Sequence, residues 1–399
     1  MEDKLYWYWL CGKVRLPIKK QKELMDIFIH PKELYKINPE ILKEHMTQLE
    51  YDRFVRSRDE TAIQKDYEAL HRENIRFIIQ KEAAYPNRLR KIYDAPYGIF
   101  QKGQPYEEKE LSIAIVGSRY PTTYGFEISK KFAKELAQQG VQIVSGLARG
   151  VDGTVHREII DKKGQAVGVL GCGIDLIYPK ENFQLFYDMY ANQTVISEYP
   201  PGSEPLKWHF PERNRIISGL SDGILVTEAR ARSGSLITAD LAMEQGKEVF
   251  CVPPYDITEP GCMGVVPLLQ DGAHPVYSVH SILEEYYPLY GDRIDLKALS
   301  EIMIRSRRAE VVREQRQKVA DEPAYQAPKP EAVAKRTELP ELSELQKRLY
   351  EVLTEEPRPV DDIISEAGLK PYQALASMTE LELLGLATAH PGRRYSKAD

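Results

Sequence analysis

Between residues 111 and 276 the chain alternates short apolar runs with amphipathic stretches of helical spacing. Several of the runs are continuously apolar, which is typical of parallel strands that are buried on both faces of a sheet. The expected strands are SIAIVG (112–117), VQIVSG (141–146), QAVGVLG (165–171), TVISE (194–198), GILVTE (223–228) and EVFCVP (248–253). Because helical stretches separate these strands, the pattern predicts an α/β fold with a Rossmann-like, doubly wound, mostly parallel sheet.

The segments that flank this core differ from it in composition. Residues 1–75 are charged and aromatic and predict a small helical (SAM-like) domain. The expected core domain covers 76–290, and its first part, 76–110, is an extension that docks on the sheet. Residues 291–340 are expected to form a charged helix and then a flexible Pro- and Lys-rich linker. Three helical patterns and a turn-rich hairpin predict a winged-helix-like module over 341–399.

The charge of the chain argues against a uniformly basic polyanion binder. The net charge is −6; residues 111–276 hold 15 Lys and Arg against 19 Asp and Glu, and residues 341–399 hold 7 against 11. Any binding of nucleic acid therefore has to come from a local basic patch. The acidic winged-helix-like module is expected to contact protein or to play an auxiliary part.

The cysteines and the first residues bear on the compartment. The chain has four cysteines, far apart and without metal-ligand spacing, which predicts reduced thiols and no metal site. The opening residues, MEDKLYWYWL, lack the apolar region of a signal peptide. No apolar run is long enough to span a bilayer. We therefore expect a cytoplasmic protein that binds neither a cofactor nor a membrane.

Polar or glycine-containing turns follow nearly every expected strand. In an open α/β sheet ligands bind beyond the carboxyl ends of the strands, so these turns are expected to form one site. After the first strand, Gly117 and Ser118 permit a close approach of backbone to ligand, and Arg119 can meet an anion where a helix begins. A plain turn with a solvated arginine is the alternative. The next two turns hold Ser145, Gly146, Arg149 and Lys180.

The segment LKWHFPERNR holds Lys207, Trp208, Phe210, Arg213 and Arg215. Cations interleaved with aromatic rings suit single-stranded nucleic acid, because cations meet phosphates while a ring stacks on a base. The alternative places Phe210 and Trp208 in the core, with one arginine paired to Glu228 or another local acid.

The turn SGSLITA is typical of a phosphate-binding turn, since Ser233, Gly234 and Ser235 open a helix there. The lysine of a P-loop does not follow, and the GxGxxG fingerprint is absent, which disfavours an ordinary ATPase or NAD-dependent dehydrogenase. Glu198 and Glu228 both follow strands and could face each other at the sheet edge. A hydrolytic role therefore stays open.

Together these motifs resemble the DNA-processing protein A (DprA/Smf) family, and the resemblance covers nearly all of 111–276. It is carried by GSRYPT (117–122), SGLARGVDGTVH (145–156), GCGIDLIYPKEN (171–182), ISEYPPG (196–202), FPERNRIISGLSDGILVTEA (210–229) and RSGSLITADLAMEQGKEVFCVP (232–253).

The resemblance implies a non-catalytic protein that binds single-stranded DNA. Such proteins protect incoming DNA during natural transformation, load the RecA recombinase onto it, and form homodimers through the core domain. Carried over by motif, the expected DNA contacts are Arg119, Ser145, Gly146, Arg149, Lys180, Lys207, Phe210, Arg213 and Arg215, and the expected phosphate turns are Gly117, Ser118, Ser233, Gly234 and Ser235.

Two stretches depart from the family pattern. Residues 261–273 read GCMGVVPLLQDGA where a G-T-N or G-S-N run is usual, and residues 11–21 lack a Gly-rich helix–hairpin–helix turn. An enzyme is the alternative function: a nucleotide phosphoribohydrolase of the lysine-decarboxylase-like group. Those enzymes carry a PGGxGT turn followed by a catalytic Glu, whereas ARSGSLITA here lacks both the double glycine and the Glu at that spacing.

Overall fold

The computed structural model describes residues 2–162, 164–256, 258–290 and 342–398. The described residues fall into two compact units, one within 2–290 and one within 342–398. The charged helix and linker that the sequence predicts over 291–340 lie outside the described residues.

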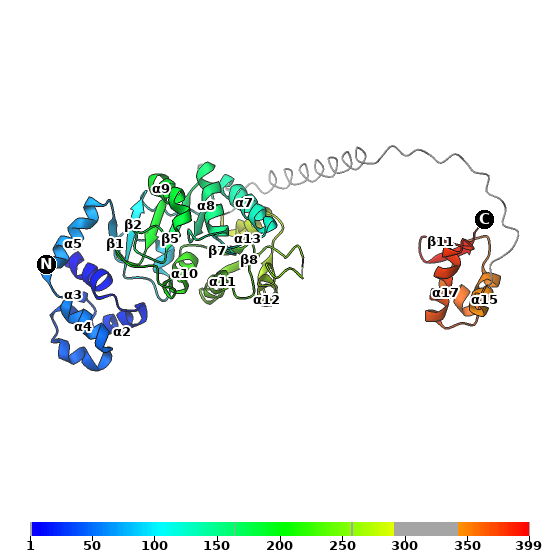
Figure 1. Cartoon of the computed structure of the whole chain (residues 1–399), viewed down its shortest axis with the longest axis horizontal. Helices are drawn as coiled ribbons and strands as arrows, with labels where there is room; N and C mark the ends of the chain where they lie inside the picture. Colours follow the sequence, from blue (N-terminus) through cyan, green and yellow to red (C-terminus); the bar gives the residue numbers. More distant parts are fainter. Residues whose placement is uncertain (1, 163, 257, 291–341, 399) are drawn as a thin grey trace. The chain divides into compact units, whose positions relative to one another are not determined.

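The first unit begins with a group of short helices, coloured blue in Figure 1. They are α1 (Asp3–Tyr8), the π-helical turn η1 (Trp9–Val14), α2 (Ile18–Phe28), α3 (Pro31–Lys36), the 3₁₀ segment η2 (Pro39–His45), α4 (Gln48–Arg56) and α5 (Glu60–Arg72). Helix α4 begins with a capping box in which Thr47 and Glu50 each bond the other's backbone N–H. The aromatic residues at the start of the chain are core: Trp9 and Phe54 are fully buried and their rings pack edge to face.

A nine-stranded sheet follows, in the order β1-β2-β6-β5-β4-β3-β7-β8-β9. Its strands are β1 (Arg76–Ile79), β2 (Gly98–Gly103), β3 (Ser112–Val116), β4 (Gln142–Ser145), β5 (Ala166–Leu170), β6 (Thr194–Ser197), β7 (Gly223–Val226), β8 (Glu248–Cys251) and β9 (His274–Pro275). Strands β3 to β9 pair in parallel, whereas β1 and β2 are antiparallel. The predicted mostly parallel, Rossmann-like sheet is confirmed, with its six expected strands at β3 to β8.

The extension 76–110 does more than dock on the sheet. It adds β1 and β2 as an antiparallel edge and a short helix, α6 (Asn87–Arg90), between them. Strand β2 pairs with β6, so the backbone groups of β6 on that side are bonded. The edge is buried because the N-terminal helices pack on it: Tyr8 contacts the rings of both Phe77 and Phe100.

Helices cover both faces of the sheet. They are α7 (Thr123–Gln138), α8 (Val151–Asp161), α9 (Phe183–Asn192), α10 (His209–Gly219), α11 (Gly234–Glu244), α12 (Val265–Gln270) and α13 (Val279–Tyr290). Along β3, Ile113 and Ile115 face the core that holds α7, α8, α9 and α13, while Ala114 and Val116 face the core that holds α6, α10, α11 and α12. This alternation explains why the strands read as continuously apolar.

The second unit is the predicted winged-helix module, which is confirmed. It consists of α15 (Glu344–Val352), β10 (Arg358–Pro359), α16 (Val360–Glu366), α17 (Pro371–Leu383), β11 (Ala387–His390) and β12 (Arg394–Lys397). The strands form a small sheet in the order β10-β12-β11. The module has a core of its own around Leu349, Ile363 and Met378.

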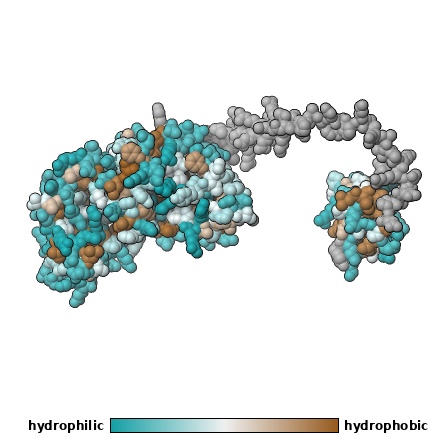
Figure 2. Space-filling model, viewed as in Figure 1, coloured by the Kyte–Doolittle hydropathy of each residue, from teal (hydrophilic) through white to brown (hydrophobic). Residues whose placement is uncertain are grey.

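The surface of the described part is mixed. On the face shown in Figure 2, hydrophilic residues cover most of residues 2–290, with smaller apolar patches between them. No helix among the described residues is both long and apolar enough to cross a membrane. All four cysteines are buried as free thiols.

Candidate nucleic-acid interface

A crevice of about 360 Å³ opens beyond the carboxyl ends of β3 and β7. These two strands are neighbours, but the chain leaves β3 for α7 on one face of the sheet and leaves β7 for α11 on the other. Such a switch point leaves a gap in which α/β proteins bind ligands. The walls come from residues 117–120 after β3, from the start of α10 and from residues 230–238 at the start of α11.

The crevice is basic although the core as a whole is acidic. Arg119, Lys207, Arg230 and Arg232 line it and are exposed. The one carboxylate among the lining residues is Asp152, which is buried. Among the described residues, no carboxylate pairs with any of these four cations. Together they form the local basic patch that binding of a polyanion requires.

An aromatic side chain lines the same crevice. Phe210, in the first turn of α10, is half-buried and lines the crevice. The guanidinium of Arg119 lies 5.5 Å from the centre of its ring, and the ring of Tyr178 lies 5.5 Å away on another side. A Cβ on Gly171 would come within 2.9 Å of the Phe210 ring, so a glycine there lets the ring sit close to the end of β5.

The start of α11 faces the same crevice. Ser233 is its N-cap, and the hydroxyl of Ser233 accepts a hydrogen bond from the backbone N–H of Ser235 at 3.3 Å. A Cβ on Gly234 would meet nothing within 4 Å, so the backbone is open to an incoming group at this point. Exposed N–H groups at a helix N-terminus favour an anion.

Three of the expected contact residues are buried at the floor of the crevice, and of these Arg213 is among its lining residues. The guanidinium of Arg213 is buried and donates hydrogen bonds to the carbonyl oxygens of Gly146, at 2.9 Å, and of Val169. Asp152 accepts a hydrogen bond from the N–H of Gly146 at 3.1 Å, so the carboxylate braces this turn instead of capping α8. The hydroxyl of Ser145 is buried and donates to the carbonyl of Ile115.

Burial shifts the pKa values of Arg213 and Asp152 at the floor of the crevice. It lowers the pKa of the Arg213 guanidinium, an effect that the neighbouring Asp152 opposes. Burial raises the pKa of Asp152, while Arg213 and the backbone hydrogen bonds at residues 146 and 148 act against it. Arg213 thus ties α10 to the ends of β4 and β5, while Asp152 ties the start of α8 to the turn after β4.

Comparisons with known proteins agree with this geometry. Residues 76–287 match the family model described as DNA recombination-mediator protein A, and residues 333–393 match the model described as the DprA winged helix domain. The chain belongs to the DprA family. The core match alone spans more than half of the 399 residues, and the winged-helix match identifies the second unit as well.

Individual relatives also carry the names DprA or Smf. The chain is 44% identical over 218 residues to the DNA processing protein DprA of Bacillus subtilis, covering 54% of this chain and 73% of the relative. It is 34% identical over 347 residues to the protein Smf of Synechocystis, covering 82% and 81%. The crystal structure of DprA from Streptococcus pneumoniae superposes with a TM-score of 0.61 at 32% identity, covering 71% of this chain and 99% of that one. This is a family of DNA-processing proteins.

Two further cations of this DprA-family chain lie outside the crevice. Arg149 is exposed, donates a hydrogen bond to the hydroxyl of Tyr120 at 3.3 Å and forms an ion pair with Glu181. Lys180 is exposed at the start of a short 3₁₀ segment, Lys180–Asn182, after β5. Because Tyr120 does line the crevice, Arg149 lies next to it, whereas Lys180 is not among the lining residues.

Arg215 is buried and points away from the crevice. Its guanidinium lies 2.7 and 2.8 Å from the two carboxylate oxygens of Glu198 and 3.1 Å from Asp94. Burial lowers the pKa of Arg215, but these carboxylates outweigh that effect and raise it. An arginine that pairs with a local acid was the alternative interpretation of this segment, and the acid is Glu198 and not Glu228.

Glu198 and Glu228 do not face each other. They follow β6 and β7, which are four strand spacings apart in the sheet, so their backbones are about 19 Å apart. Glu228 is buried and accepts hydrogen bonds from the backbone N–H of Thr122, at 2.9 Å, and from its hydroxyl. Each carboxylate is thus held by a partner, and the idea of a paired-carboxylate hydrolytic site at this edge was wrong.

Sequence reasoning missed Arg230 and Arg232. Both follow β7 in the turn TEARARSGS and line the crevice, as Arg119 does after β3. The signal was present, because a cation directly after a parallel strand is the same argument that selected Arg119. The sequence did not show that the turns after β3 and β7 lie side by side.

Proposed function

We propose that this protein binds single-stranded DNA in the crevice between β3 and β7. Arg119, Lys207, Arg230 and Arg232 bind the phosphates, and the exposed N–H groups at the start of α11 add to this. The observation that carries the proposal is that four exposed cations without carboxylate partners among the described residues line the same crevice as the half-buried ring of Phe210.

The single strand is favoured over the duplex by the position of Phe210. Its ring is half-buried within the crevice, so a base reaches it only when that base has no partner strand in the way. Stacking on an aromatic ring is worth about 1–3 kcal/mol per base and tolerates any sequence. Arg149 and Lys180 are assigned to the flanks of the path, where the exposed side chains can reach a strand that leaves the crevice.

The remaining predicted contacts are assigned a supporting part. Ser145, Gly146 and Arg213 form the buried floor, and Arg215 holds α10 to β6 through Glu198. In this proposal they place Phe210 and Lys207 without contacting DNA themselves. Gly117, Ser118, Ser233, Gly234 and Ser235 line the crevice and bring the backbone close to the phosphates.

We further propose that the protein is a non-catalytic, cytoplasmic mediator that protects incoming DNA and loads RecA onto it during natural transformation, acting as a homodimer through the core domain. The description of the family as recombination mediators supports this role. RecA loading is tested by assembling RecA filaments on a strand coated with single-strand-binding protein. Faster assembly in the presence of this protein supports the role, and unchanged assembly refutes it. Light scattering across a concentration series tests the dimer.

The DNA-binding proposal is tested by fluorescence polarisation with labelled oligo-dT and with a duplex of equal length, at two salt concentrations. Four phosphate contacts on a single strand give a log–log salt slope of about −2.8. The variant Arg119→Ala/Arg232→Ala should flatten this slope by about 1.4. Lys130→Ala is the control, because Lys130 lies on α7 outside the crevice and pairs with Glu127. Unchanged affinity and slope in the double variant would show that the crevice does not bind DNA.

A further inference from the structure

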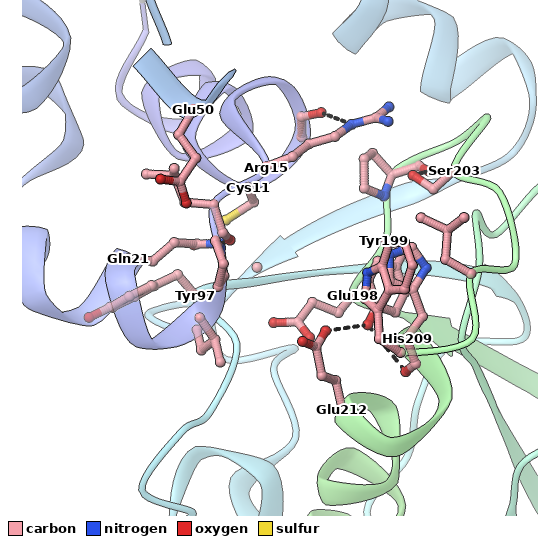
Figure 3. A pocket seen from close by; sticks show the side chains of 18 of the residues that line it. Cys11, Arg15, Gln21, Glu50, Tyr97, Glu198, Tyr199, Ser203, His209 and Glu212 are labelled. Atoms are coloured by element: carbon pink, nitrogen blue, oxygen red, sulfur yellow. Dashed lines mark hydrogen bonds between the residues drawn. The ribbon is translucent and has the colours of Figure 1, made fainter. Parts of the chain in front are cut away.

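A second cavity, of about 810 Å³, lies between the N-terminal helices and the core domain. Figure 3 shows Arg15, Gln21 and Glu50 on the N-terminal side and Tyr199, His209 and Glu212 on the core side. The N-terminal helices and the core share one continuous apolar cluster, so this cavity lies within a single packed body.

The cavity and the crevice are adjacent. The stretch that leads into the first turn of α10 separates them: Lys207 and Phe210 line the crevice, whereas Trp208 and His209 line the cavity. Pro211 lines both. We call residues 207–211, which lie between the crevice and the cavity, the ridge. A DNA strand that leaves the crevice past Lys207 therefore crosses the ridge before it reaches the second cavity.

The ridge carries an exposed tryptophan. Trp208 is 61% exposed, whereas Trp7 and Trp9, the other two tryptophans, are 3% and 0% exposed. Its ring lies edge-on to His209, with 5.9 Å between the ring centres, and His209 in turn stacks on Tyr199 at 4.0 Å. An indole held by a stacked pair and open to solvent on its other side is a platform for a base.

Two arginines stand on the far wall of the cavity. The Nε of Arg15 donates to the carbonyl of Gly12 at 3.3 Å, and the guanidinium of Arg53 donates to the carbonyl of Arg15 at 3.2 Å. Among the described residues neither guanidinium pairs with a carboxylate. Arg15 also adopts a left-handed backbone conformation with φ of 56°, which is unfavourable for a residue with a side chain. Burial and the neighbouring charge of Arg53 both lower the pKa of Arg15.

Most of the carboxylates that line the cavity already have partners. Glu50 is 2.7 Å from the ammonium of Lys20, and Glu198 and Asp94 pair with Arg215. Glu212 accepts a hydrogen bond from the Tyr199 hydroxyl at 3.1 Å. Glu204 is the lining carboxylate without a partner among the described residues. Lys13 and Arg215 also line the cavity but are paired with carboxylates, which leaves Arg15 and Arg53 to bind an added anion.

We propose that the bound single strand continues from the crevice over Trp208 and into this cavity, where a base stacks on Trp208 and Arg15 and Arg53 bind the phosphates beyond it. This inference rests on the proposed function and extends it. It gives the N-terminal helices a direct part in DNA binding, one that does not depend on a helix–hairpin–helix turn.

The test compares a short strand that fills only the crevice with a longer one that reaches the cavity. Fluorescence polarisation is measured with oligo-dT of about 6 and about 24 nucleotides. Trp208→Ala and Arg15→Ala/Arg53→Ala should weaken binding of the longer strand about tenfold and leave the shorter one unchanged, while Trp208→Phe restores most of the affinity. Arg56→Ala is the matched control, because Arg56 lies on α4 with Arg53 but does not line the cavity.

Intrinsic fluorescence gives a second, direct readout. Because Trp7 and Trp9 are buried, quenching by DNA reports on Trp208. The longer strand should quench the wild-type protein and not Trp208→Phe. Thermal unfolding of each variant identifies any that is unfolded, and for such a variant the quenching of the wild-type protein stands as the test.

The two proposals fail in different ways. If crevice variants weaken both strands but cavity variants weaken neither, and the longer strand does not quench fluorescence, the path over Trp208 is wrong and the crevice proposal stands. If the cavity binds dTMP or GMP alone while Arg15→Ala/Arg53→Ala leaves oligo-dT affinity unchanged, the cavity is a small-ligand site and the inference is overturned. If crevice variants change nothing for either strand, the proposed function itself fails.

Discussion

The guanidinium of Arg119 lies 5.5 Å from the centre of the Phe210 ring, and this contact links the turn after β3 to the start of α10. The two residues are far apart in the sequence, yet they form one wall of the crevice. In the proposed function, this contact places a phosphate-binding cation beside a ring on which a base stacks.

Removal of the Phe210 ring should weaken DNA binding with little loss of stability. Phe210→Leu keeps the apolar volume beside Gly171 but removes the stacking surface, so affinity for oligo-dT should fall about tenfold. Phe210→Tyr keeps the ring and should bind nearly as wild type. Fluorescence polarisation measures both. Equal affinity of Phe210→Leu and the wild type would mean that no base stacks at this position.

Replacing Arg215 should lower the stability of the folded protein. Arg215→Met leaves Glu198 and Asp94 without their cation in a largely buried place, so the free energy of unfolding should fall by about 2–3 kcal/mol. Adding Glu198→Gln should recover part of that loss. The control is Arg149→Met, whose exposed pair with Glu181 should contribute at most about 1 kcal/mol. Full stability together with lost DNA binding in Arg215→Met would instead place Arg215 in contact with DNA.

The variant Glu228→Gln helps to distinguish a DNA-binding protein from a phosphoribohydrolase. Its carboxylate holds the N–H and hydroxyl of Thr122, the N-cap of α7, so Glu228→Gln should lower the free energy of unfolding by about 1–3 kcal/mol. The wild-type protein incubated with AMP should release no free adenine by chromatography. Adenine release that is lost in Glu228→Gln would support the phosphoribohydrolase alternative.

His156 should make stability depend on pH. Burial lowers its pKa from 6.5 to about 4. The folded state therefore disfavours the charged ring, and the unfolded state binds more protons between these two values. Stability should be full above pH 6.5 and fall as the pH drops toward 4, by up to about 3 kcal/mol from this group alone.

Other titratable groups near His156 also make stability depend on pH. Asp152 has a raised pKa, so it acts in the opposite sense and is stabilising where it is protonated. The measurement is therefore the difference between the wild type and His156→Asn in urea unfolding at several pH values. This difference should shrink toward acid pH. A difference that is constant with pH would mean that His156 titrates alike in both states.

The local patterns predicted much of this molecule. Continuous apolar runs placed β3 to β8, and Arg119, which the turn after β3 suggested as an anion contact, lines the crevice, while its contact with DNA stays a prediction. On α10 the structure buries Arg213 and Arg215, which the sequence had suggested as DNA contacts, although Arg213 still lines the crevice. A buried arginine is stable only where the fold brings it carbonyl or carboxylate partners, and those partners come from β5 and β6.

The sequence by itself determined which segments become strands, which become helices and which turns carry cations, since these depend on the spacing of neighbouring residues along the chain. Only the tertiary structure decided which turns meet. Strand order follows from how the connecting helices pack on the two faces of the sheet. That packing puts β3 beside β7 and leaves β6 four strand spacings from β7. Arg119 therefore shares its crevice with Arg230 and Arg232, which the sequence did not single out, while Arg215, close to Phe210 in the chain, is buried against Glu198 beside the second cavity.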